Sequence, residues 1–215
     1  MYLREIFYAL EHQTNKDFNV WISDHSLDQK VLEVCREYCE SFEINYIQNE
    51  ENRGEISANT NRALRDADGE ILKVLFQDDF ILTKTLVDEL DKAFVDGVEW
   101  AVTGFAHTID DGKTHYNPKI PQYNDRLLEG VNTLSSPSIL AMKRGKHEYF
   151  DEKLTMLMDC DMFYRLYKYH RFIDSVDSTE SIDSIDSVDS IDSIDSIDSI
   201  DSIESVYSMG CLKNL

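Results

Sequence analysis

Long apolar runs, basic clusters and paired cysteines are all missing from this sequence. No run approaches the roughly 20 apolar residues that a membrane-spanning helix needs. The N-terminus also lacks the basic and apolar regions of a secretory signal. We therefore expect a soluble, cytoplasmic protein without a transmembrane segment.

Basic residues are scarce, with 21 Lys and Arg against 42 Asp and Glu, so the formal net charge is −21. The imbalance is uneven, because residues 1–173 carry a net charge of −11 and residues 174–215 one of −10. Neither part offers the positive surface that a phosphate backbone requires. The composition therefore argues against a nucleic-acid partner.

The four cysteines show neither a CxxC spacing nor the pattern of a disulfide framework. Cys35 and Cys39 fit one face of a predicted helix, and free Cys is among the most frequently buried residue types. We expect both to be small core residues.

Apolar residues recur with alternating helical and strand periods through residues 1–105. Helices are expected near residues 3–10, 31–42, 56–67 and 86–94, and strands near 18–23, 44–47, 71–76 and 100–105. This alternation predicts a three-layer α/β fold with a mostly parallel sheet.

The strand expected at residues 71–76 is almost entirely apolar and is followed by Asp78 and Asp79. Such a run is typical of a central strand that is buried on both faces. Ligands of open α/β sheets bind beyond the carboxyl ends of the strands, so this carboxylate pair could hold a divalent cation and, through it, a diphosphate. An ordinary acidic turn is the alternative.

The second half of the chain is less regular. Residues 107–137 contain all three prolines and little periodicity, which is typical of a long excursion that could close over a substrate. A short strand is expected at residues 138–142. It is followed by a helix whose apolar side runs from Met162 to His170 and whose first turn carries Asp159 and Asp161.

From residue 173 the character of the sequence changes. Residues 174–205 repeat an Asp-Ser-Ile triplet with eleven carboxylates and no base. A period of three matches neither a strand nor a helix, so we expect residues 173–206 to be disordered and dispensable. We favour a neutral repeat expansion over a functional polyanionic tail. Residues 1–172 would form the folded core, and residues 207–215 a short tail.

The carboxylates at strand and helix ends suggest a reaction. Sugar transfer from a nucleotide donor needs a cation on the diphosphate leaving group and a separate carboxylate that takes the acceptor proton. Asp78 and Asp79 could provide the first group. Asp159 could provide the second, because a helix N-terminus keeps a carboxylate ionised.

Five segments also carry a family resemblance. They are Gln13 to Phe18 after a first helix, Trp21 to Ser26, Asn52 to Gly54 with Asn61 to Leu64 and Ala67 to Glu70, Phe76 to Asp79, and Met158 to Asp161 with Arg165 and Leu166. These segments resemble motifs of the family 2 glycosyltransferases, which have the GT-A fold. The first two resemble the family's "nQTykdfE" turn and its second strand, and the third resembles its "N.G...A.N.al..A.Ge" run. Phe76 to Asp79 occupies the DXD position, and the last segment resembles the "ED.D...RL" motif. Five motifs in series are more specific than any one of them.

The resemblance implies a Rossmann-like nucleotide-sugar-binding core and metal-assisted, inverting transfer to a hydroxyl of a glycan, lipid-linked or polysaccharide acceptor. It implies that Asp24 contacts the base of the donor. Asp79 would be the principal ligand of Mn²⁺ or Mg²⁺, with Asp78 near the metal or the ribose. Asp159 would be the catalytic base and Asp161 a structural partner.

Three features differ from the family pattern. The chain starts after the usual first strand, Met158 and Phe76 replace acidic motif residues, and the repeat stands where a closing strand and acceptor-side helices should follow. We therefore expect a core that is trimmed at both ends, and the trimming could abolish activity. The sheet should have an unprotected edge and the donor pocket an open wall.

Two other functions stay open. One is a non-catalytic interaction protein with an acidic tail, which would keep the fold without catalysing a reaction. A measurement of nucleoside diphosphate binding in the presence of manganese separates this protein from an enzyme. A metal-dependent phosphohydrolase also uses clustered acids. The spacing favours it less, because Asp159 lies some 80 residues from the Asp pair and no His ligand motif accompanies them.

Overall fold

The structure of the chain is a computed structural model that describes residues 2–95, 97–110, 113–171 and 207–212. The predicted repeat at residues 174–205 lies outside these ranges. None of the helices in the described part of the chain is long and apolar enough to cross a membrane.

The described elements follow the predicted alternation of helix and strand. Their bounds are α1 Leu3–Glu11, β1 Asn19–Asp24, α2 Lys30–Tyr38, β2 Glu43–Gln48, α3 Ile56–Asp66, β3 Ile71–Phe76, α4 Leu86–Ala93, β4 Trp100–Val102, β5 Phe105–His107, β6 Tyr116–Lys119, the 3₁₀ turns η1 Asp125–Glu129 and η2 Pro137–Ile139, β7 Leu140–Lys143, α5 Met158–Tyr169 and β8 Tyr207–Leu212.

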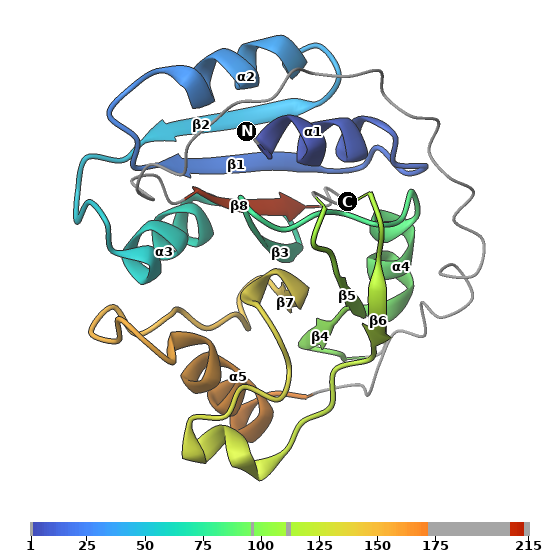
Figure 1. The fold of residues 1–215 in the computed structure, drawn as a ribbon, viewed down its shortest axis with the longest axis vertical. Coiled ribbons are helices and arrows are strands. Elements are labelled where there is room, and N and C mark those ends of the chain that lie inside the picture. The colour runs from blue at the N-terminus through green and yellow to red at the C-terminus, as the bar shows by residue number, and fades with distance from the viewer. Residues whose placement is uncertain (1, 96, 111–112, 172–206, 213–215) are drawn as a thin grey trace.

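A six-stranded sheet in the order β2-β1-β8-β3-β7-β4 forms the middle of the protein (Figure 1). β1 pairs in parallel with β2, whereas β8 is antiparallel to β1 and β3, and β7 is antiparallel to β3 and β4. Strands β1 to β4 therefore share one direction, which β7 and β8 oppose. The α/β prediction is confirmed, but the sheet is mixed, because its only parallel pair of neighbouring described strands is β1 with β2.

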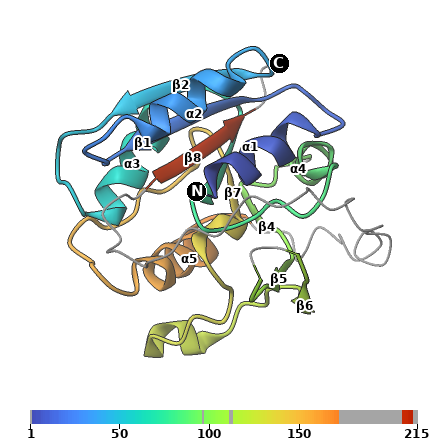
Figure 2. The same cartoon turned by 45° about the horizontal axis from the view of Figure 1, so that its top comes forward.

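Helices cover both faces of the sheet, which gives three layers (Figure 2). On one face, apolar side chains of α1, α2 and α4 pack together with Val20, Ile22 and Leu75. On the other face, side chains of α3 and α5 pack with Leu72 and Val74, together with side chains of β4 and β7. Alternate residues of β3 thus face opposite cores, as expected for a strand that is buried on both faces.

The excursion predicted at residues 107–137 carries structure of its own. It contains β6 and η1, and β6 pairs with β5, at the start of the excursion, in a separate two-stranded sheet. The strand expected at residues 100–105 is split accordingly, because β4 ends at Val102 and Phe105 already belongs to β5.

The two cysteines of the predicted helix differ in their burial. Cys35 is buried in α2, and this burial raises the pKa of its thiol to about 12. The expectation for Cys39 was wrong, because this residue follows the last turn of α2 and is exposed. The helix ends at Tyr38, before the apolar pattern in the sequence ends.

β8 pairs with a strand on each side. Against β1, Tyr207 lies opposite Asp24 and Leu212 lies opposite Asn19. Against β3, the pairing runs through residues 208–211. The unprotected sheet edge that the missing first strand predicts is not found at β1 or β3. Instead, β8 lies between β1 and β3 and satisfies backbone groups of both strands. The sheet ends in β2 and β4.

We expect that Met209→Pro lowers the melting temperature of the chain. Proline removes one N–H from a strand that is paired on both sides. Loss of a buried hydrogen bond costs roughly 1–3 kcal/mol, and in a chain of this length each kcal/mol corresponds to about 2–4 °C. Thermal unfolding should therefore show a decrease of about 2–12 °C.

The matched control is Ile191→Pro, within the repeat, which should leave the melting temperature unchanged. Equal melting temperatures for Met209→Pro and Ile191→Pro would show that β8 does not stabilise the sheet.

Candidate active site

Asp78 and Asp79 lie directly after β3, where the sequence places them. The turn is closed by a hydrogen bond from the Asp79 backbone N–H to the carbonyl of Phe76, 3.2 Å long. Asp78 is exposed and Asp79 is half-buried. The Ser136 hydroxyl donates a hydrogen bond of 2.6 Å to Oδ2 of Asp79, which fixes the orientation of this carboxylate.

The pair carries negative charge that no Lys or Arg within the described ranges neutralises through an ion pair. Partial desolvation, and next the charge of Asp79, raise the pKa of Asp78 above its ordinary value. Like charges held side by side in this way are relieved when a cation binds between them.

The Asp pair fits a divalent metal that is shared with a substrate. In the described part of the chain, no three His, Cys, Asp or Glu side chains come together as a complete metal site. Mg²⁺ in particular is commonly held by one or two carboxylates, with phosphate oxygens and water as its remaining ligands. Asp78 and Asp79 could supply the protein ligands of such a site.

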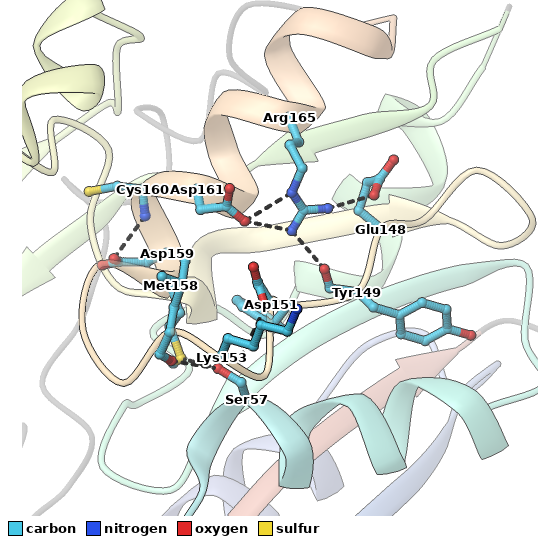
Figure 3. Close-up of polar contacts among 12 residues, drawn as sticks. Ser57, Glu148, Tyr149, Asp151, Lys153, Met158, Asp159, Cys160, Asp161 and Arg165 are labelled. Carbon is cyan, nitrogen blue, oxygen red and sulfur yellow. Dashed lines mark hydrogen bonds and ion pairs between the residues drawn. The ribbon is translucent and has the colours of Figure 1, made fainter.

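Asp159 lies in the first turn of α5, and both of its carboxylate oxygens accept hydrogen bonds. Nδ2 of Asn132 donates to Oδ2 at 2.6 Å. The backbone N–H of Cys160 donates to Oδ1 at 2.8 Å (Figure 3). Each carboxylate oxygen has a second lone pair, so a proton or an acceptor hydroxyl can still be bound. Desolvation, followed by the charge of Asp159, raises the pKa of the Cys160 thiol to about 11 and keeps it protonated at neutral pH.

Asp161 lies one helical turn before Arg165 and forms an ion pair with it at 2.9 Å. Arg165 also contacts Glu148 at 2.5 Å and donates to the carbonyl of Tyr149 at 2.7 Å (Figure 3). Arg165 therefore fastens α5 to the segment that precedes it, and Asp161 orients this guanidinium group from within the same helix.

Asp24 ends β1 and is completely buried. Its carboxylate accepts hydrogen bonds from the backbone and hydroxyl of Ser26, at 2.7 and 2.8 Å, and from the hydroxyl of Tyr46 at 2.7 Å. A donor could bind this carboxylate directly only if Ser26 or Tyr46 moved away. Tyr46, on β2, was not identified from the sequence, because its contact depends on the pairing of β1 with β2.

His25, next to Asp24, is also buried. Burial, and to a lesser extent the charge of Arg53, lower its pKa, so the imidazole is neutral at pH 7. Nη1 of Arg53 donates to the backbone carbonyls of His25 and Ser26 at 2.9 and 3.1 Å. The loop with Arg53 thus closes over the end of β1.

The structure connects the predicted residues through a short loop. Ser136 contacts Asp79 and Asn132 contacts Asp159, although the two aspartates are far apart in the sequence. The carboxylate of Asp24 makes its described hydrogen bonds with Ser26 and Tyr46. Asp24 lies at the same end of the sheet as Asp78 and Asp79, since β1 and β3 point the same way with β8 between them. Sequence reasoning missed Asn132 and Ser136, which lie in the irregular excursion and next to no recognisable motif.

We expect Asp78→Asn to stabilise the metal-free protein at pH 7. The pKa of Asp78 is higher in the folded protein than its ordinary value, so ionisation opposes folding at neutral pH. The cost vanishes below the unfolded pKa, where the carboxyl group is protonated in both states. Asp78 is exposed and water screens its charge, so the melting temperature should rise by only about 1–2 °C.

The control is Glu40→Gln, which removes an exposed carboxylate elsewhere on the surface. The gain from Asp78→Asn should shrink at high salt and at acidic pH. A loss of stability at pH 7 would contradict the repulsion between Asp78 and Asp79.

The family model described as Glycosyl transferase family 2 matches residues 1–150. The match spans α1 to β7 and includes Asp24, Asp78 and Asp79, and it ends before α5 with Asp159. No curated protein matches the chain. The match covers more than half of the sequence and confirms the family that the five motifs predict, so the chain belongs to glycosyl transferase family 2.

Proposed function

We propose that this glycosyltransferase transfers a sugar from a nucleotide-sugar donor to a hydroxyl acceptor, with inversion and with the help of Mn²⁺ or Mg²⁺. The observation that carries the proposal is the attachment of Asp79 and Asp159 to one loop, through Ser136 and Asn132. A metal ligand and a separate base are the two groups that this chemistry needs.

On the donor side, Asp79 would be the principal metal ligand and Asp78 would bind the metal or the ribose. The metal would neutralise charge on the diphosphate as it leaves. Ser136 occupies one lone pair of Asp79 Oδ2, and Oδ1 has no described hydrogen bond, so the carboxylate keeps capacity for a cation. Asp24 would contribute to the pocket of the donor base, after release of Ser26 or Tyr46 or through the backbone that it orders.

On the acceptor side, Asp159 would act as the general base. The acceptor oxygen attacks the anomeric carbon of the donor, and Asp159 takes the proton from that oxygen. The bond from the anomeric carbon to the phosphate oxygen breaks, and the nucleoside diphosphate leaves with the electron pair. One displacement from the opposite face inverts the configuration. The acceptors that fit the family are glycans, lipid-linked sugars and polysaccharides.

The metal site predicts that Asp79→Ala weakens binding of UDP or GDP in the presence of Mn²⁺ by at least about tenfold, since a charged ligand is lost. Isothermal titration calorimetry with and without Mn²⁺ measures this change. Glu40→Gln, which removes a distant exposed carboxylate, should bind like the unchanged chain. Nucleotide binding of equal strength without metal would contradict the site.

The base assignment predicts that Asp159→Asn lowers turnover by about 10²-fold or more and leaves donor binding nearly unchanged, as expected for loss of general-base catalysis. Steady-state kinetics and calorimetry on the same preparation separate the two effects. Asp161→Asn should instead lower thermal stability, because it breaks the ion pair with Arg165. Full turnover in Asp159→Asn would disprove the assignment.

The same assays test the non-catalytic alternative. Metal-dependent nucleotide binding without turnover of any UDP-sugar or GDP-sugar would favour an interaction protein over an enzyme.

A further inference from the structure

Residues 132–138, which we name the bridging loop, are held firmly against the sheet. Leu134, Pro137 and Ser138 are buried, and Leu134 belongs to the core that packs under α5. The hydroxyl of Ser138 accepts a hydrogen bond of 2.7 Å from the backbone N–H of Phe76, at the end of β3. The buried ammonium group of Lys73 donates to the carbonyl of Ser138. The loop is therefore attached to β3 through both polar groups of Ser138.

The side chain of Asn132 uses its full hydrogen-bonding capacity. Oδ1 accepts from the backbone N–H groups of Leu134 and Ser135, both at 3.0 Å. Nδ2 donates to the carbonyl of Ser135 and to Oδ2 of Asp159, both at 2.6 Å. Only an oxygen can accept from two N–H groups, so the amide orientation is fixed and an N–H is presented to Asp159.

The side chain of Ser136 is likewise oriented by the loop backbone, and it presents a donor to Asp79, the proposed metal ligand. Its hydroxyl accepts from the backbone N–H of Ser138 at 3.1 Å, so its hydrogen is free to be donated to Asp79 at 2.6 Å. Asn132 and Ser136 are thus each oriented by the backbone of the bridging loop, and each presents one donor to a carboxylate of the proposed site.

The backbone on both sides of the Asn132–Asp159 contact is unusual. Ser135 has a φ of 148° and Leu157, just before α5, has a φ of 60°, both in the region that favours glycine. Gly130 also approaches Leu157 closely, since an added Cβ would lie 3.1 Å from its side chain. Non-glycine residues stay in such conformations where their surroundings hold them, and they concentrate at functional sites.

We propose that Asn132 and Ser136 are positioning residues of the transfer reaction. Asn132 sets the rotamer of the base, Asp159, and Ser136 sets the rotamer of the metal ligand, Asp79. Their attachment to one rigid loop fixes the base relative to the metal-bound donor. The inference rests on the proposed function and deepens it, because it names the residues that align the two halves of the site.

Asn132 is exposed, so its contact with Asp159 contributes little to the stability of the fold. A positioning role and a structural role therefore predict different results. Loss of position affects the chemical step, because even a small misplacement of a catalytic group slows the reaction strongly. Loss of a merely structural contact would change the melting temperature and leave turnover intact.

The test compares Asn132→Asp and Ser136→Ala with the unchanged full-length chain. Asn132→Asp is nearly isosteric and keeps an oxygen for the N–H groups of Leu134 and Ser135. It puts a carboxylate oxygen in place of the amide nitrogen that donates to Asp159 and to the carbonyl of Ser135. Ser136→Ala removes the donor to Asp79, and Ser136→Thr restores a hydroxyl. The substrate is the UDP-sugar or GDP-sugar that the unchanged chain consumes fastest. The rate is measured as the release of UDP or GDP.

For Asn132→Asp we expect kcat to fall by about tenfold or more, with the donor KM and the melting temperature nearly unchanged. For Ser136→Ala we expect the Mn²⁺ concentration at half-maximal rate to rise by about tenfold, and Ser136→Thr to recover most of this loss. The matched control is Asn124→Asp, which exchanges an exposed loop amide that caps η1 and has no described contact with Asp79 or Asp159.

Unchanged kcat in Asn132→Asp and unchanged metal dependence in Ser136→Ala would overturn the inference while the proposed function stands. A fall in melting temperature that fully accounts for the lost activity would overturn it as well. If the unchanged chain consumes no UDP-sugar or GDP-sugar, the proposed function itself fails, and the positioning role fails with it.

Discussion

The burial of β3 on both faces is the constraint on which the rest of the structure depends. Residues 71–75 are all buried, so their backbone N–H and C=O groups must find partners inside the sheet. β7 and β8 lie on either side of β3 and pair with it. The strand can meet water only where it ends, and that end carries Asp78 and Asp79. The exposed carboxylate pair is therefore a consequence of where the buried strand stops.

Lys73 shows how a charged group is kept inside this strand. It is the only Lys or Arg among the buried described residues, and its ammonium group donates to the carbonyls of Ser138 and Val74. Burial of a charge without hydrogen bonds would cost far more than burial of an apolar side chain. The contact with Ser138 attaches the bridging loop to β3. The same polar interaction thus stabilises the interior and places Ser136 next to Asp79.

The local pattern of the sequence predicted most elements of the core, because apolar period and turn residues act over short distances. It predicted β3 with its acidic end, the helix that carries Asp159, and the family. It did not predict that β4 ends at Val102 and is followed by β5, or that Cys39 lies outside α2. The excursion has no periodicity that would mark β6 or η1. Asn132 and Ser136 were missed for the same reason, since neither belongs to a regular element.

The sequence by itself determined the α/β class, the position of the carboxylates at strand and helix ends, and membership of glycosyl transferase family 2. These properties depend on residue type and short-range spacing. Only the tertiary structure decided the sheet order, the insertion of β8 between β1 and β3, the burial of Asp24 by Ser26 and Tyr46, and the loop shared by Asp79 and Asp159. Those features join residues that are distant in the chain. Such pairings are set by packing and by the need to satisfy buried polar groups, which no local pattern encodes.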